Sequence, residues 1–248
     1  MTGSAISVEN VTKNFGGIRA VDSVSFEVPI GQRRVLIGPN GAGKTTLFHC
    51  ITGTMFASAG CVKLFGQDVT ELPESRRTER GMGRTFQITN VLTDLTVGEN
   101  VALAIVGTDR RKWMMHRRIA TLDAVREQAM RGLEVVGLRS RADDPVKLLS
   151  YGERRQLELA LALNTQPKVL FLDEPCAGLS PSERQRISAL VKALPRDITI
   201  VMIEHDMDVA LGLADCVTVL NRGRLMAEGT PQEVQANPQV RDVYFGHA

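Results

Sequence analysis

A glycine-rich segment that follows a short apolar run constrains this chain more than any other part of its sequence. Residues 38–46 read GPNGAGKTT, and the apolar run 35–37 before them is typical of a strand buried on both faces. The pattern GxxxxGK followed by Thr is significant when it lies between a strand and a helix, as it does here. Gly41 and Gly43 let the backbone curl until successive N–H groups point at one anion, and the following helix adds its positive N-terminal end. The segment therefore predicts a phosphate-binding loop, with a simple glycine turn as the alternative.

The polar residues of this loop indicate a nucleoside triphosphate bound with magnesium. Lys44 supplies a mobile cation for the β and γ phosphates, and the hydroxyl of Thr45 can ligate the Mg²⁺ that bridges them. We expect the whole segment to bind the nucleotide: Gly38, Pro39, Asn40, Gly41, Ala42, Gly43, Lys44, Thr45 and Thr46. These residues indicate what is bound and leave open what is done with it.

Two acids stand where a later apolar run ends. Residues 169–175 read VLFLDEP, so that Asp173 and Glu174 lie at the tip of an expected buried strand. An acid pair in such a place costs free energy unless a cation lies nearby. Asp173 fits the Mg²⁺-associated carboxylate of a phosphoryl-transfer site, and Glu174 fits a general base that orients and deprotonates an attacking water. An acidic cap on the next segment is the alternative interpretation.

Alternation of apolar strands with helical segments predicts an α/β fold with a mainly parallel sheet covered on both faces. Further buried strands, with helices between them, are expected at residues 169–172, 198–203 and 217–220. Alternating apolar positions before residue 30 and at 61–65 predict a separate antiparallel sheet. Residues 96–164 contain no credible strand and predict an inserted all-helical subdomain. We expect a single domain spanning residues 1–248.

Local signals mark the helix boundaries. An apolar stripe with three- and four-residue steps ends before Gly137, which predicts one helix of the insert and its C′ residue: Ile119, Leu122, Val125, Ala129, Leu133 and Val136. Four pairs have the capping-box spacing and predict helix starts: Thr96/Glu99, Ser150/Glu153, Ser180/Glu183 and Thr230/Glu233. The cationic run at 110–118 is interpreted as a solvated helix face, with a docking site for acidic groups as the alternative.

Composition and charge exclude several classes of protein. Lys and Arg number 30 against 28 Asp and Glu, and the net charge of +2 is too balanced for a chain that lies broadly on nucleic acid or anionic lipid. No stretch approaches the roughly 18 apolar residues needed to cross a bilayer, and the N-terminus shows no secretory signal. The cysteines lack CxxC spacing, which predicts reduced, buried thiols in a cytosolic protein, with disulfides or a zinc site as the alternatives: Cys50, Cys61, Cys176 and Cys216. We therefore expect any association with a membrane to occur through a partner protein.

Residues 149–153 read LSYGE, and with this segment the chain resembles the ATP-binding subunits of ABC transporters, whose signature is LSGGQ. Further motifs agree with that family in order and spacing: Phe15 at the aromatic position before the phosphate loop, Gln87 in GRTFQ as the Q-loop, AGLS at 177–180 as the D-loop and His205 in IEHDM as the switch histidine. The resemblance covers essentially the whole chain. It implies a P-loop NTPase core with an antiparallel β subdomain and an inserted helical subdomain, and ATP with Mg²⁺ as ligands.

The resemblance also implies a role for each matched residue. Phe15 would stack on adenine, since an aromatic ring can bind the flat face of a base without hydrogen bonds. Gln87 would offer its amide oxygen to Mg²⁺ or to the attacking water, so that the expected metal ligands are Thr45, Gln87 and Asp173. His205 would donate to the γ-phosphate. The expected catalytic residues are Lys44, Gln87, Glu174 and His205.

The signature implies a second anion site. Ser150 has the position of a helix N-cap, and the free N–H groups of such a helix can bind phosphate. In the resembled family this site meets ATP bound to the opposite subunit, so that two subunits pack head to tail around two ATP molecules. The residues carried over are Leu149, Ser150, Tyr151, Gly152 and Glu153 in the signature, and Ala177, Gly178, Leu179 and Ser180 in the D-loop. Tyr151 and Glu153 replace the commonest glycine and glutamine of the signature. Ser180 replaces the usual aspartate of the D-loop, and this D-loop change bears on communication between the two ATP sites.

Finer wording, notably LSYGERRQLELA, EPCAGLSPSE and the terminal VYFG, resembles ATPase subunits of importers for branched-chain and other hydrophobic amino acids. That resemblance implies a second ATP-binding subunit, identical or different, two transmembrane permease subunits and, indirectly, a solute-binding protein. The chain would then lie on the cytoplasmic face of the inner membrane. Transport of another solute such as lipid or urea, a non-transport ABC ATPase and a soluble P-loop kinase are the alternatives, and no nucleic-acid partner is expected.

Overall fold

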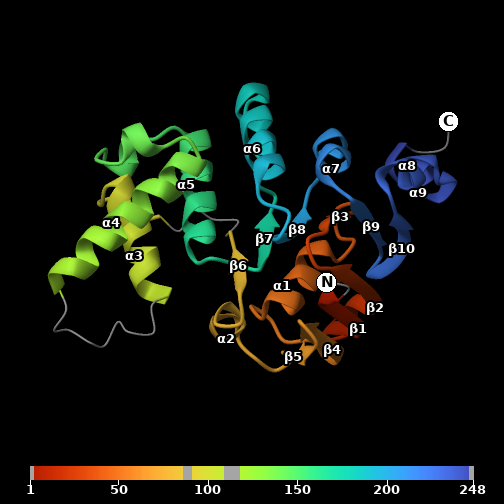
Figure 1. Cartoon of the computed structure of the whole chain (residues 1–248). Helices are drawn as coiled ribbons and strands as arrows, with labels where there is room; N and C mark the ends of the chain where they lie inside the picture. The colour runs from red at the N-terminus through yellow and green to blue at the C-terminus, as the bar shows by residue number, and fades with distance from the viewer. Residues whose placement is uncertain (1–2, 86–90, 109–117, 246–248) are drawn as a thin grey trace.

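The computed structural model describes residues 3–85, 91–108 and 118–245, which form two β-sheets and a set of helices (Figure 1). The strands of the larger sheet lie in the order β10-β9-β3-β8-β7-β6. Their bounds are β3 Arg33–Ile37, β6 Met82–Arg84, β7 Val169–Asp173, β8 Thr199–Ile203, β9 Cys216–Asn221 and β10 Arg224–Gly229. Every neighbouring pair is parallel except β9 with β10. The predicted mainly parallel sheet is confirmed, and the three later strands begin and end within one residue of the expected positions.

The smaller sheet is antiparallel, as predicted, with the strand order β2-β1-β4-β5. Its strands are β1 Ser4–Phe15, β2 Ile18–Pro29, β4 Ala59–Leu64 and β5 Gln67–Asp68. The alternation in β2 places Val24, Phe26 and Val28 in the core and leaves the residues between them exposed.

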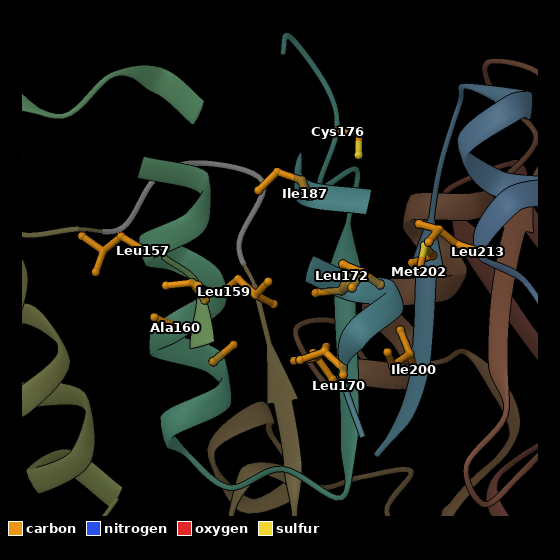
Figure 2. Packing of buried hydrophobic residues seen from close by; sticks show 14 of the residues in the cluster. Leu157, Leu159, Ala160, Leu170, Leu172, Cys176, Ile187, Ile200, Met202 and Leu213 are labelled. Atoms are coloured by element: carbon orange, nitrogen blue, oxygen red, sulfur yellow. The ribbon is translucent and has the colours of Figure 1, made fainter. Parts of the chain in front are cut away.

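Helix α1 (Lys44–Thr52) packs with the smaller sheet against one face of the larger sheet. Phe48 of α1 and Phe171 of β7 meet edge to face, with ring centroids 5.3 Å apart and ring planes at 82°. Leu172, the next residue of β7, points to the opposite face, where Leu159 and Ile187 lie beside it (Figure 2). Both faces of the sheet are therefore buried, which is why its central strands are continuously apolar.

The helical insert predicted for residues 96–164 is present in the described part of that segment. It contains α3 Val97–Thr108, α4 Arg118–Val135, the short 3₁₀ turns η1 Arg139–Arg141 and η2 Val146–Leu148, and α5 Tyr151–Asn164. The chain leaves α4 at Gly137 with φ 75°, and the N–H of Leu138 donates to the carbonyl oxygen of Leu133 at 2.8 Å. The expected stripe faces the core at Ala129, Leu133 and Val136. The side chains of Ile119 and Leu122 and the cationic run 110–118 lie outside the described residues.

All four predicted capping boxes form. In each one the N-cap hydroxyl accepts from the N–H three residues later, and the carboxylate at that position accepts from the N–H of the N-cap residue. They open α3, α5, α6 (Pro181–Ala193) and α8 (Pro231–Ala236). The remaining helices are α2 Glu74–Thr78, α7 Met207–Leu213 and α9 Pro238–Phe245.

A buried guanidinium holds the C-terminal end of α1. Arg77 of α2 is 1% exposed and donates to the carbonyl oxygens of Cys50 and Ile51 at 2.8 and 2.6 Å. It also donates to Thr70 and Leu72 at 2.9 and 2.8 Å. Burial lowers the pKa of Arg77 to about 10, so that the side chain stays charged at neutral pH. The last carbonyl groups of α1, which lack intrahelical partners, are thereby satisfied.

The cysteines are free thiols, and Cys50, Cys176 and Cys216 are buried, as predicted. The prediction of a buried thiol is wrong for Cys61, which is only partly buried because it lies next to the exposed start of β4. Among the described residues, no helix has both the length and the apolar character that a membrane crossing requires.

We expect Phe171→Ala to lower the free energy of unfolding by about 3–5 kcal/mol, because it removes a fully buried ring and leaves a cavity against Phe48. Urea denaturation followed by circular dichroism measures the change. Leu103→Ala, at a side chain that is 50% exposed on α3, is the control and should cost less than about 1 kcal/mol. An equal loss in both variants would contradict the packing described for β7.

Candidate nucleotide-binding site

The loop between β3 and α1 leaves the N-terminal end of α1 open to a ligand. Gly43 is the N-cap residue with φ 94°, and a Cβ there would lie 2.3 Å from the carbonyl oxygen of Ala20. Only glycine fits, because the backbone conformation and the close approach both exclude a side chain. Helix α1 has no side-chain cap and no acid in its first turn, unlike the four helices with capping boxes. Its free N–H groups and positive end are therefore available to an anion.

Lys44, the first residue of α1, bends back over this loop. Its ammonium donates to the carbonyl oxygens of Gly38 and Pro39 at 2.6 and 3.0 Å, and the residue is 5% exposed. Burial lowers the pKa of Lys44, while the nearby carboxylate of Glu174 raises it. Thr45 follows in the first turn, half-buried. A buried cation bound to neutral carbonyl groups can gain from the charged oxygens of a phosphate.

Asp173, the last residue of β7, is a buried acid with unsatisfied oxygens. It is 1% exposed, and neither carboxylate oxygen accepts a hydrogen bond from a described residue. Nη2 of Arg84 lies 3.6 Å from Oδ2. Burial raises the pKa of Asp173, while the positive charge of Arg84 opposes that shift. A buried carboxylate of this kind fits a cation ligand.

Magnesium fits these residues without a cage of protein ligands. Mg²⁺ usually keeps several waters and binds through one or two protein groups together with substrate phosphates. Asp173 and Thr45 are a sufficient set for that mode of binding. The described residues contain no cluster of three or more His, Cys, Asp and Glu side chains that could hold a metal by themselves. Gln87, the third expected ligand, lies outside the described residues.

Glu174 and His205 face each other across the ends of β7 and β8. Oε1 of Glu174 and Nε2 of His205 are 2.7 Å apart, and their side chains are 16% and 44% exposed. Glu174 has φ 48°, and its N–H donates to the carbonyl oxygen of Ile203 at 3.1 Å. A positive φ is uncommon outside glycine and marks a residue that the surrounding structure holds in a strained backbone conformation. In this pair, the Glu174 carboxylate can accept a proton, and the His205 imidazole can hold that carboxylate in position.

Glu204 also belongs to this site, although the sequence reasoning did not identify it. It is 3% exposed, and its Oε1 accepts from the N–H of Cys176 at 3.1 Å while Oε2 accepts from the N–H of His205 at 3.3 Å. Burial raises the pKa of Glu204, while these backbone donors lower it. The carboxylate connects the loop after β7 with the loop after β8 and so fixes Glu174 and His205 relative to each other. The available signal was the acid directly before the histidine in IEHDM.

The predicted signature lies at the start of α5, which covers the opposite face of the larger sheet from α1 (Figure 1). Ser150 caps the helix, and the hydroxyl of Tyr151 accepts from Nη2 of Arg155 at 2.8 Å. The N–H of Gly152 donates to Oε1 of Glu183 in α6 at 3.2 Å. Within one chain the structure therefore brings together the loop, Asp173, Glu174 and His205, and places the signature apart from them.

The predicted D-loop connects Glu174 with α6. The N–H of Ala177 donates to the carbonyl oxygen of Glu174 at 3.0 Å, Leu179 is buried, and Ser180 is the N-cap of α6. Phe15, the expected adenine contact, lies at the end of β1 with 46% of its surface exposed. The ammonium of Lys13 lies over this ring, 5.4 Å from its centroid, so that a base could stack only on the other face of the ring.

Comparison with known proteins shows the family to which this arrangement belongs. The model of the ABC transporter family matches residues 21–177, more than half of the chain. The chain belongs to the ABC transporter family. This ABC ATPase hydrolyses ATP, and the loop at 38–46, Asp173 and Glu174 all lie within the matched residues.

Two relatives named for branched-chain amino acid transport match over their full lengths. It is 35% identical to the high-affinity branched-chain amino acid transport ATP-binding protein BraF of Pseudomonas aeruginosa and 37% identical to LivG of Escherichia coli K12, with 100% of each chain covered. A nucleotide-free ATP-binding cassette from an ABC transporter superposes with a TM-score of 0.84 at 31% identity, covering 100% of both chains. A dimeric cassette bound to ADP and phosphate superposes with a TM-score of 0.77 at 25% identity, covering 91% of this chain and 98% of that one.

A second family model matches the C-terminal segment of this ABC ATPase. It is described as a branched-chain amino acid ATP-binding cassette transporter and covers residues 224–248. In the structure, the described part of this segment is β10, α8 and α9 at the edge of the larger sheet (Figure 1).

We expect Lys44→Ala to weaken ATP binding at least about tenfold, because the charge that the phosphates would meet is lost from the loop. Equilibrium titration with a fluorescent ATP analogue measures the affinity. Lys63→Ala is the matched control, since Lys63 pairs with Glu9 on the smaller sheet, and it should bind like the parent protein. Unchanged affinity in Lys44→Ala would show that nucleotide does not bind at this loop.

Proposed function

We propose that this ABC ATPase energises the import of branched-chain or other hydrophobic amino acids. The match of residues 224–248 carries the proposal, because this segment lies outside the general ABC match and corresponds to amino acid transport cassettes in particular. The full-length relatives named for branched-chain amino acid transport support it. In this proposal residues 1–248 act as one ATP-binding domain.

The proposed assembly contains a second ATP-binding subunit, identical or different, packed head to tail against this one. Two transmembrane permease subunits bind the pair and hold it at the cytoplasmic face of the inner membrane, and a solute-binding protein delivers the amino acid to them. The existence of dimeric cassettes among the structural relatives supports the pairing. The position of the signature on the far face of the sheet supports a second subunit as the source of the ATP that it meets.

In the proposed mechanism, the loop and the start of α1 bind the ATP phosphates while Phe15 stacks on the adenine. Lys44 turns from the carbonyl groups of Gly38 and Pro39 to the β and γ phosphates. Thr45, Asp173 and Gln87 hold Mg²⁺, which when bound neutralises charge on the phosphoryl group being transferred. The Asp173 carboxylate, which accepts no hydrogen bond from a described residue and pairs with Arg84 at 3.6 Å, would gain a second cation as partner.

Hydrolysis uses the pair at the ends of β7 and β8. The Glu174 carboxylate orients a water molecule toward the γ-phosphate and accepts its proton. His205 lies with Nε2 at 2.7 Å from Oε1 of Glu174, and with a hydrogen on Nε2 it donates to Glu174 or, once ATP is bound, to the γ-phosphate. Glu204 keeps both loops in register during this exchange.

Closure and reopening of the dimer then couple the binding and hydrolysis of ATP to movement of the permease subunits. Ser150 and Gly152 of each subunit bind the γ-phosphate held by the other, so that ATP favours the closed state. Hydrolysis removes this contact and the dimer opens. The segment around Gln87, between the catalytic core and the helical subdomain, passes the change to the permease subunits.

We expect Glu174→Gln to reduce ATP turnover at least about 100-fold while ATP binding is retained, because an amide cannot accept the proton of the attacking water. Phosphate release measures turnover. Glu127→Gln, which alters a surface carboxylate paired with Arg131 on α4, is the control and should turn over like the parent protein. Normal turnover in Glu174→Gln would show that another group is the base.

Affinity purification of the tagged Glu174→Gln protein from its native membranes, with ATP and Mg²⁺, tests the proposed partners. Recovery of membrane permeases together with a second ATP-binding subunit would support the transporter. Recovery of ribosomes, of nucleic acid or of this chain alone would contradict it and leave the ATPase assignment intact.

Uptake measurements test the solute. We expect deletion of the gene to abolish ATP-dependent uptake of labelled leucine, isoleucine and valine, and the parent gene but not the Glu174→Gln gene to restore it. Sulfate uptake is the internal control, because a sulfate/thiosulfate import ATP-binding protein of Shewanella oneidensis is 38% identical over 97% of this chain and 66% of that protein. Loss of sulfate uptake with normal leucine uptake would contradict the proposed solute.

A further inference from the structure

Two capping boxes of this chain have the same sequence pattern but differ in one contact. Ser180 and Glu183 open α6, Thr230 and Glu233 open α8, and proline is the first helical residue in both. Oε2 of Glu183 accepts from the N–H and the hydroxyl of Ser180 at 3.0 and 2.6 Å. Oε2 of Glu233 does the same with Thr230 at 2.7 and 3.0 Å. Glu183 has a further partner, since its Oε1 accepts from the N–H of Gly152 at 3.2 Å.

Gly152 lies where α5 could offer a hydrogen bond to a phosphate. It is the second residue of the helix, and the first N–H groups of a helix have no intrahelical acceptor. The N–H of Glu153 is already bound to the Ser150 hydroxyl at 3.2 Å. The N–H of Gly152 points to the Glu183 carboxylate instead, and a Cβ at this position would lie 2.4 Å from Oε1. Glycine therefore allows the acid to approach the start of the signature helix.

The group that occupies this place is an anion. Hydrogen bonds from the side chain and the backbone of Ser180, and from the backbone of Gly152, lower the pKa of Glu183, so that it is ionised at neutral pH. A negative charge is favourable at the N-terminal end of a helix. A second anion at the same N–H would be repelled by the negative charge of Glu183, and the two anions would compete for one hydrogen-bond donor.

We propose that Glu183 is a positioning residue that holds the signature N–H of Gly152 until the γ-phosphate of ATP on the opposite subunit displaces it. The inference rests on the head-to-tail arrangement under the proposed function. The Glu183 carboxylate also accepts a hydrogen bond from Ser180, the last residue of the D-loop, so that its displacement would move the D-loop. Ala177, the first residue of the D-loop, is hydrogen-bonded to Glu174. The contact therefore sets the ATP concentration at which the subunits close and links closure to the catalytic acid.

Nucleotide occlusion tests this competition. Complexes that carry Glu174→Gln are purified from membranes, incubated with increasing ATP and Mg²⁺, and passed rapidly through gel filtration, and the ATP retained is measured. With Glu183→Gln added, we expect half-maximal occlusion at an ATP concentration about two- to fivefold lower, because the competing charge is gone. Glutamine keeps the shape of the side chain and one acceptor, so that α6 keeps its cap. Glu233→Gln in the same background is the matched control and should not shift the curve.

A second variant reaches the same contact from the other side. Ser180→Asp keeps an N-cap acceptor for α6, removes the hydroxyl that donates to Glu183 and places a second carboxylate beside it. We expect the shift to be in the same direction as for Glu183→Gln, since the acid is repelled from its present position.

The outcomes separate this inference from the proposed function. If Glu174→Gln complexes occlude ATP and Glu183→Gln leaves the midpoint unchanged or raises it, Glu183 is a structural cap and the competition is wrong. If the Glu174→Gln complexes retain no ATP at any concentration, the head-to-tail site itself is wrong and the inference falls with it.

Discussion

The parallel pairing of β3, β8 and β7 is the constraint on which the rest of the site depends, because parallel strands end at the same edge of a sheet. Leu36 pairs with Ile203, and Ile203 with Asp173, so that the loops after these strands begin at one level. Residues far apart in the chain meet there for this reason alone. The apolar cores on the two faces hold the register, since a slip by one residue would exchange the faces of Leu170 and Phe171.

That edge carries groups that a folded protein tolerates poorly without a ligand. Asp173 is buried with no hydrogen bond from a described residue and with Arg84 at 3.6 Å as its ion-pair partner. Lys44 is a buried cation, and Glu174 has a left-handed backbone. Each arrangement costs free energy in the free protein, and ATP with its cation removes part of the cost. Stability therefore comes from the cores and function from the edge, and the two are separable by mutation.

Features encoded by neighbours in the sequence could be predicted, whereas contacts made by packing could not. The phosphate loop, the capping boxes and the turn at Gly137 each depend on a few consecutive residues. Glu204 bridges two loops, and Glu183 reaches Gly152, 31 positions away, only because α5 and α6 lie side by side. No periodicity or motif specifies such a contact. The role of Gln87 stays a prediction, since it lies outside the described residues.

Helix α1 has an open start and a closed end. The start offers its N–H groups, while Arg77 of a different segment occupies the carbonyl groups at the other end, about 13 Å away. A helix anchored in this way presents a rigid array of donors, so that an arriving phosphate does not bear the entropy of ordering them. We therefore expect a substitution of Arg77 to weaken nucleotide binding indirectly, because it would loosen the end of α1 opposite the phosphate loop.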